Sequence, residues 1–330
     1  MDVSEVPVLD LRTLLCHDAV GELRNIGPIV EIRSGPDAET TEPVAVRELE
    51  ALRHLPLITM MVEPDPSLPK SSLHESMDLL VPAELRGQVI ARVMENPQAA
   101  MVLARLLRAT EFLPVLNAIE LESFAYATLQ SGSEFSRWLS TRAVRQQAPP
   151  SRAPLAVTDA GANVTLTLNR PESANALNAV LRAELVSSLS ALALTDSAIE
   201  LAGRGPHFCA GGDLREFGLA ENPAMAHMTR MRQNLPAAMA RVSTRLTARV
   251  HGSCVGAGME MASFAGRVVA APGTTWRLPE VSMGLLPGCG GTVSIPRRIG
   301  RQRTLLLALA DLKIGVHTAL SWGLIDAVDG

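Results

Sequence analysis

Four glycine-containing segments hold the residues of this sequence that could do chemistry. They are 169–177 (NRPESANAL), 205–214 (GPHFCAGGDL), 251–260 (HGSCVGAGME) and 278–292 (LPEVSMGLLPGCGGT). The last two contain Glu260 and Glu280, whose carboxyl groups could transfer protons to or from a bound molecule. The paired glycines of the second and third segments let a backbone approach a ligand closely. Glycines of this kind also fit ordinary tight turns, so one segment alone predicts little.

Taken together and in this order, the four segments resemble the crotonase (enoyl-CoA hydratase/isomerase) superfamily. The patterns NRPxxxNAL, FCAGxDL, HGxxxGxGxE and LPEVxxGLxPGxGGT all occur with the spacing usual for that family. The resemblance covers about residues 155–330. It implies an α/β fold built as a ββα superhelix. It also implies an enzyme that acts on an acyl-CoA or acyl-carrier thioester, with coenzyme A as part of the substrate and no other cofactor.

The resemblance implies an oxyanion hole at two backbone positions. Chemistry at the α or β carbon of a thioester builds negative charge on the thioester oxygen, and peptide N–H groups stabilise that charge. Losing one such donor typically lowers the rate by about 10²–10³. By motif position, the donors are Gly212 and Ala257. The family commonly has glycine at the second position, but alanine offers the same N–H.

The resemblance also places Glu260 and Glu280 at the two acid/base positions of enoyl-CoA hydratases. One carboxylate would activate water toward the β carbon, and the other would exchange the α proton. Proximity and burial should raise the pKa of at least one of them. Family members that keep one glutamate include isomerases, so the intact pair favours hydration or dehydration. The alternatives are a double-bond isomerase, a cofactor-free aryl-acetyl-CoA dioxygenase, or a non-catalytic scaffold paralogue.

Substrate-binding positions carried over from the family surround these four residues. They are Ala176, Leu177, Ala210, Gly211, Asp213, Leu214, Arg215 and Gly256. Phe217 and Trp276 are candidates for the acyl pocket. A helix start before Cys289 could lower the pKa of its thiol, although a packing role is the simpler interpretation. His207 and His251 have no partner at metal-ligand spacing, so we expect no metal.

The elements that must position these residues follow from the hydrophobic pattern. In the C-terminal part we expect strands at 164–168 and 198–202, a helix at 175–194, and helices that open near 210 and 257. In the N-terminal part we expect strands at 28–33 and 56–62, a helix at 43–54, and helices through 82–145. The proline-rich stretch around 149–154 predicts a linker between a mainly helical region, 1–148, and a catalytic domain, 155–330.

The composition restricts the partners. The 330 residues are 47% hydrophobic and 19% charged, with a net charge of −4, which is unfavourable for a nucleic-acid partner. There is no apolar run of the ~18 residues that a membrane helix needs. The four cysteines form no CxxC pair and suggest a reduced, cytoplasmic protein. The resemblance adds the expectation of a homo-oligomer, a trimer or a hexamer.

One feature departs from the family pattern. Crotonases continue past the segment that matches 323–326 with helices that cover the active site, whereas this sequence ends at Gly330. Residues 79–142 resemble that missing tail. We therefore expect the N-terminal region to supply the helices that cover the site, although it shows no polar cluster that by itself predicts chemistry.

Overall fold

A computed structural model describes residues 6–9, 27–32, 46–63, 71–142, 152–220 and 222–329. Four predicted features lie partly outside these ranges: the linker at 149–151, the start of the helix at 43–45, the last residue of the strand at 28–33, and the end of the helical stretch at 143–145. Cys16 also lies outside them.

The C-terminal part is built on a six-stranded sheet in the order β13-β10-β8-β7-β6-β5. Its strands are β5 (Leu155–Asp159), β6 (Asn163–Leu168), β7 (Ala198–Gly203), β8 (Leu246–Val250), β10 (Arg267–Ala270) and β13 (Ala327–Val328). Only β5 runs antiparallel to its neighbour. Val164, Leu166 and Leu168 alternate onto the buried face of β6, which explains why this strand was predictable.

A second, three-stranded sheet lies beside the first and joins β9 (Ser253–Val255), β11 (Thr275–Arg277) and β12 (Ile314–Gly315). Helices connect and cover the strands. They are α9 (Ala179–Leu192), α10 (Pro223–Arg232), α11 (Leu235–Val242), α12 (Ala257–Phe264), α13 (Gly291–Ser294), α14 (Pro296–Ile299), α15 (Arg301–Leu309) and α16 (Val316–Trp322). Short 3₁₀ turns complete this part: η5 (Pro171–Ser173), η6 (Leu214–Glu216), η7 (Ser243–Arg245) and η8 (Glu280–Met283). The α/β class is confirmed.

Helix α9 begins four residues later than predicted. The side chain of Asn178 accepts a hydrogen bond from the N–H of Leu181 at 2.9 Å and caps the helix there. Residues 175–177 instead form part of a loop, in which Leu177 pairs with Gly212. Residues 175–177, which the prediction placed in the helix, are therefore in a loop that can border a binding site.

The N-terminal part contains a four-stranded parallel sheet as well as helices. Its strands are β1 (Val8–Leu9), β2 (Ile29–Ile32), β3 (Ile58–Glu63) and β4 (Leu79–Pro82). Its helices are α3 (Val46–His54), α4 (Ser72–Ser76), η4 (Ala83–Leu85), α5 (Arg86–Glu95), α6 (Pro97–Thr110), α7 (Val115–Gln130) and α8 (Ser133–Ser140). The sequence predicts β2 and β3 but not β1, which has only two residues, or β4, which runs directly into the turn η4.

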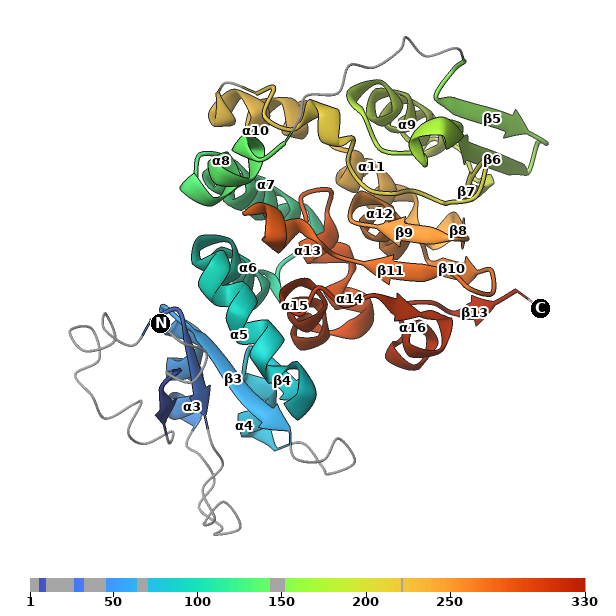
Figure 1. The fold of residues 1–330 in the computed structure, drawn as a ribbon. Coiled ribbons are helices and arrows are strands. Elements are labelled where there is room, and N and C mark those ends of the chain that lie inside the picture. Colours follow the sequence, from blue (N-terminus) through green and yellow to red (C-terminus); the bar gives the residue numbers. More distant parts are fainter. Residues whose placement is uncertain are drawn as a thin grey trace.

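The helices of the N-terminal part pack directly on the C-terminal part, and one hydrophobic core includes residues of both (Figure 1). Helices α6 and α7 contact α13, while α5 contacts α15. Buried Arg301 of α15 donates hydrogen bonds to the carbonyls of Met77 at 2.7 Å and Glu75 at 2.6 Å. No helix in the described ranges is both long and apolar enough to cross a membrane.

Candidate active site

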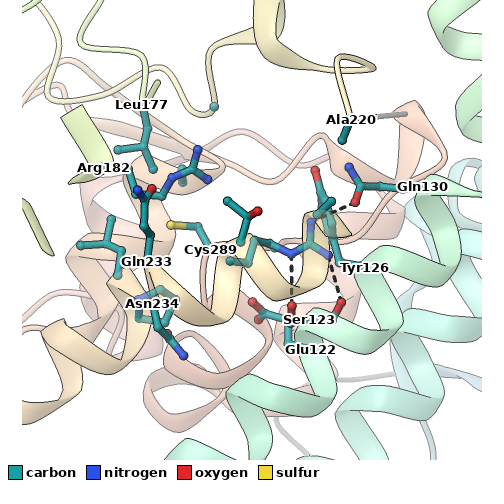
Figure 2. A pocket seen from close by; sticks show the side chains of 18 of the residues that line it. Glu122, Ser123, Tyr126, Gln130, Leu177, Arg182, Ala220, Gln233, Asn234 and Cys289 are labelled. Atoms are coloured by element: carbon teal, nitrogen blue, oxygen red, sulfur yellow. Dashed lines mark hydrogen bonds between the residues drawn. The ribbon is translucent and has the colours of Figure 1, made fainter. Parts of the chain in front are cut away.

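A cavity of about 440 Å³ lies where the two parts of the chain meet. Figure 2 shows Glu122, Ser123, Tyr126 and Gln130 of α7 on one wall, and Arg182, Gln233 and Asn234 on the opposite wall. Six of the residues predicted for the site line this cavity: Leu177, Gly212, Asp213, Ala257, Glu260 and Glu280. The structure therefore brings together both predicted glutamates and both predicted N–H donors.

The two N–H donors lie on neighbouring loops that are bonded to each other. The N–H of Val255 donates to the carbonyl of Cys209 at 3.0 Å, and the N–H of Leu177 donates to that of Gly211 at 2.8 Å. Gly211 has a φ of 103°, and a Cβ there would lie 3.2 Å from the carbonyl oxygen of Val255. The N–H groups of Gly212 and Ala257 donate to no acceptor within the described ranges. Both residues border the cavity, so their N–H groups are available to an anion there.

Glu260 lies one turn into α12, as predicted, because its N–H donates to the carbonyl of Gly256 at 2.9 Å. The side chain is buried. Its Oε2 accepts hydrogen bonds from the N–H groups of Cys289 at 2.6 Å and Gly291 at 2.8 Å. Burial, together with the neighbouring carboxyl groups of Glu280 and Glu122, raises its pKa well above the usual value despite these two bonds.

Glu280 begins η8 and lies against the loop that carries Ala257. Gly256 has a φ of 48°, and a Cβ there would lie 2.3 Å from Oε1 of Glu280, so only glycine fits. Oε2 of Glu280 is buried and has no hydrogen-bond partner among the described residues. Burial is the largest cause that raises the pKa of Glu280 to about 7. An unsatisfied oxygen with this pKa is suited to accept and release a proton.

Glu122 of α7 is a third buried carboxyl in the cavity, and sequence analysis missed it. Its Oε1 accepts from the N–H of Gly290 at 2.6 Å, while its Oε2 accepts from the N–H and hydroxyl of Thr292 at 2.9 and 2.6 Å. Glu260 and Glu122 thus bind alternate N–H groups of the segment 289–292. Burial raises the pKa of Glu122 to about 7. The signal that could have found Glu122 was the likeness of residues 79–142 to the family tail.

Helices α7 and α8 lie on the segment that contains Glu280. A Cβ at Gly288 would lie 2.3 Å from the ring of Tyr126. A Cβ at Gly284 would lie 2.5 Å from the backbone nitrogen of Phe135. The N-terminal helices α7 and α8 therefore lie against this side of the cavity.

The other predicted binding residues do not line the cavity. They are Ala176, Ala210, Gly211, Leu214, Arg215 and Gly256. The Nε of Arg215 donates to Oδ1 of Asp213 at 2.7 Å, and Nη2 of Arg170 donates to Oδ2 at 3.0 Å. Burial of Asp213 opposes its ionisation, but these bonds outweigh burial and hold its pKa below the usual value. Through these bonds Asp213 links Arg170 of the segment 169–177 to Arg215. A role for Arg215 in binding the substrate stays a prediction.

The residues that line the cavity test three further expectations, for Phe217, Trp276 and Cys289. Phe217 lines it, as expected. Trp276 does not; it is only 1% exposed and belongs to the core beneath β11, so that expectation was wrong. Cys289 lines the cavity, but burial raises its thiol pKa well above the usual value, which contradicts an activated thiol.

The C-terminal part of the chain is similar to known proteins. A family model described as enoyl-CoA hydratase/isomerase matches residues 159–330. The chain is 37% identical over 166 residues to a 2,3-dehydroadipyl-CoA hydratase of Escherichia coli (strain K12) and 34% identical over 169 residues to a 1,2-epoxyphenylacetyl-CoA isomerase of the same organism. Each match covers 49% of this chain and 64% of the relative, less than two thirds of its length.

Among solved structures, an enoyl-CoA hydratase from Thermoplasma volcanium is similar, with 29% identity and a TM-score of 0.49. That match covers 54% of this chain and 72% of the solved one.

Proposed function

The chain belongs to the enoyl-CoA hydratase/isomerase (crotonase) family, and we propose that it adds water to, or removes it from, an α,β-unsaturated acyl-CoA. One observation carries the proposal: a single cavity holds both glutamates and both N–H groups. A family member that kept only one glutamate would lack the second proton-transfer group that hydration needs.

In the proposed mechanism the thioester oxygen accepts hydrogen bonds from the N–H groups of Gly212 and Ala257. These donors are fixed by their loops and need no reorganisation as negative charge develops. The N–H of Ala257 is also at the first position of α12, where the helix dipole favours an anion. Electron density drawn to the oxygen makes the β carbon electrophilic.

The two glutamates then complete the addition. An ionised carboxylate takes a proton from water as the water oxygen bonds to the β carbon. The second carboxyl, protonated, gives its proton to the α carbon as the enolate collapses. The elements of one water molecule are added, and the reverse sequence removes them. Raised pKa values for Glu260 and Glu280 support a pair that shares one proton near neutral pH.

By the same proposal, helices α7 and α8 take the place of the family's C-terminal cover. The contacts of Tyr126 with Gly288 and of Phe135 with Gly284 support this role. A covered cavity excludes bulk water, which strengthens the hydrogen bonds made to the thioester.

The test is to incubate the purified protein with crotonyl-CoA and with longer and aryl enoyl-CoAs while following the absorbance of the conjugated thioester. We expect a loss of absorbance as water adds. Glu260→Gln and Glu280→Gln should each lower kcat by about 10²–10⁴, with acyl-CoA binding kept in calorimetry. Migration of the double bond without hydration would favour the isomerase, the activity named for the second relative. No reaction across the panel would reject an enzymatic role on these substrates.

A further inference from the structure

Arg230 of α10 lines the cavity without a salt bridge to any carboxylate in the described ranges. Its Nε and Nη2 donate to the hydroxyl and carbonyl of Ser123 at 3.1 and 3.2 Å, and its Nη1 donates to Gln130 at 2.9 Å. The guanidinium also lies over the ring of Tyr126, 4.9 Å from its centroid. All these hydrogen-bond partners are neutral and orient the guanidinium, and the charge of Glu122 opposes the lowering of the Arg230 pKa only in part.

A second arginine shares the cavity. Arg182 of α9 lines the wall opposite α7 (Figure 2). Its Nε is buried and has no hydrogen-bond partner within the described part of the chain. Its Nη2 forms an ion pair with the half-exposed Glu216 at 4.0 Å, a distance too long for a hydrogen bond. The charge of Arg182 lowers the pKa of Arg230, in addition to the larger effect of burial. Both guanidinium groups therefore border the same cavity.

The carboxyl groups of the cavity do not neutralise these cations fully. Glu122, Glu260 and Glu280 all have raised pKa values, so part of their population is protonated near neutral pH. Oxygens of Glu122 and Glu260 already accept hydrogen bonds from the 289–292 backbone. A partly buried cation that lacks an ionised partner is unfavourable, and a ligand anion would remove that penalty.

We propose that Arg230, assisted by the charge of Arg182, binds a carboxylate on the acyl chain, so that the preferred substrates are thioesters whose acyl group carries a distal carboxylate. This substrate class rests on the proposed function. A guanidinium presents a planar fork of N–H donors that matches a carboxylate. The three hydrogen bonds that Arg230 donates to α7 hold this fork in one orientation before the ligand binds, which reduces the entropy lost on binding.

The test compares saturated acyl-CoAs of equal chain length that end in a carboxylate, a carboxamide or a methyl group. Saturated thioesters cannot be hydrated, so calorimetry measures the binding affinity of each ligand without turnover. Losing a hydrogen bond to a charged group typically weakens binding on the order of tenfold to a hundredfold. We expect the wild type to bind the carboxylate ligand tighter by this factor. Arg230→Gln should remove the preference, and Arg230→Lys should keep part of it.

The matched control is Arg232→Gln, because Arg232 is on the same helix but exposed and outside the cavity. It should leave all affinities unchanged. Coenzyme A alone is a further control, because its phosphates are a second source of negative charge. If Arg230→Gln weakens coenzyme A, the methyl ligand and the carboxylate ligand equally, the arginine binds phosphate and the proposal is overturned.

Equal affinity of the wild type for the three ligands would also overturn the subsite, whether or not any variant folds. The two proposals fail separately. A carboxylate preference without turnover of any enoyl-CoA would reject the hydratase and keep the subsite. Turnover of crotonyl-CoA without a carboxylate preference would reject the subsite and keep the hydratase.

Discussion

At the scale of single residues, burial is what raises the pKa of the glutamates to which the proposed function assigns proton transfer. Glu122 and Glu260 are each only 2% exposed, and Oε2 of Glu280 is buried without a partner. Removing a carboxylate from water disfavours its charged form and raises its pKa. The hydrogen bonds that Glu260 and Glu122 accept from backbone N–H groups oppose this effect but do not cancel it.

This burial predicts how the stability of the protein changes with pH. Glu280 has a folded pKa of about 7 against 4.5 in the unfolded chain, so the folded state binds more protons between these values. Its contribution is fully present below pH 4.5 and is lost as the pH rises through about 7. In Glu280→Gln, the fall in unfolding free energy from pH 5 to pH 8 should be smaller by roughly 2–3 kcal/mol. Urea unfolding at both pH values measures this.

The control for that measurement is Glu120→Gln, because Glu120 is exposed on α7. It should follow the wild type at both pH values. A Glu280→Gln variant with the wild-type pH dependence would contradict the assigned pKa.

At the scale of elements, the segment 289–292 is held between two helices. Glu260 of α12 binds the N–H groups of Cys289 and Gly291, and Glu122 of α7 binds those of Gly290 and Thr292. Consecutive N–H groups thus point to alternate sides and are satisfied from both parts of the chain. The carboxyl of Glu260 is therefore oriented by a loop that α7 also holds.

Glu122→Gln should loosen this arrangement. The amide can accept from one N–H but would present its own donor to the other, so we expect a loss of about 1–3 kcal/mol of stability. The charge of Glu122 also raises the pKa of Glu260. Its removal should shift the pH–rate profile of hydration toward lower pH, which a purely structural role would not do. Glu120→Gln is the matched control on the same helix, and an unshifted profile in Glu122→Gln would contradict the coupling.

At the scale of the whole molecule, the two parts of the chain form one core. Arg301 reaches from α15 to the carbonyls of Glu75 and Met77, and it lies 3.7 Å from Asp78. Asp78 in turn forms a buried ion pair with Arg108 of α6. Breaking such a network leaves charges and carbonyls buried without partners, which is strongly destabilising.

A chain that lacks residues 1–145 should therefore be insoluble or inactive. It would expose the apolar surfaces of α13 and α15 and remove the cover over Glu280. Solubility, circular dichroism and hydration of crotonyl-CoA measure the outcome. Co-expression of the two parts as separate chains is the control, and it should recover activity if they associate. A soluble and fully active fragment 150–330 would contradict this prediction.

The sequence by itself determined the features that depend on local chemistry. The four segments predict Glu260, Glu280, Gly212 and Ala257 as site residues because the glycines at positive φ beside the two donors, Gly211 and Gly256, and a carboxyl one turn into a helix belong to short stretches of chain. Strands β6 and β7 were predictable because their alternation of apolar residues is local. The likeness of residues 79–142 to the family tail indicated that N-terminal helices would lie near the site.

Only the tertiary structure decided which distant residues share the cavity. Glu122 and Arg230 are more than 100 positions apart, and in sequence each resembles an ordinary charged residue on a helix surface. Trp276 was misassigned because a buried aromatic beneath a sheet and one lining a pocket have the same local pattern. Such roles depend on which surfaces pack together, and packing between residues far apart in the chain leaves no short-range signature. The proposed catalytic pair is therefore recognisable in the sequence, whereas Glu122 and the proposed carboxylate subsite depend on the fold.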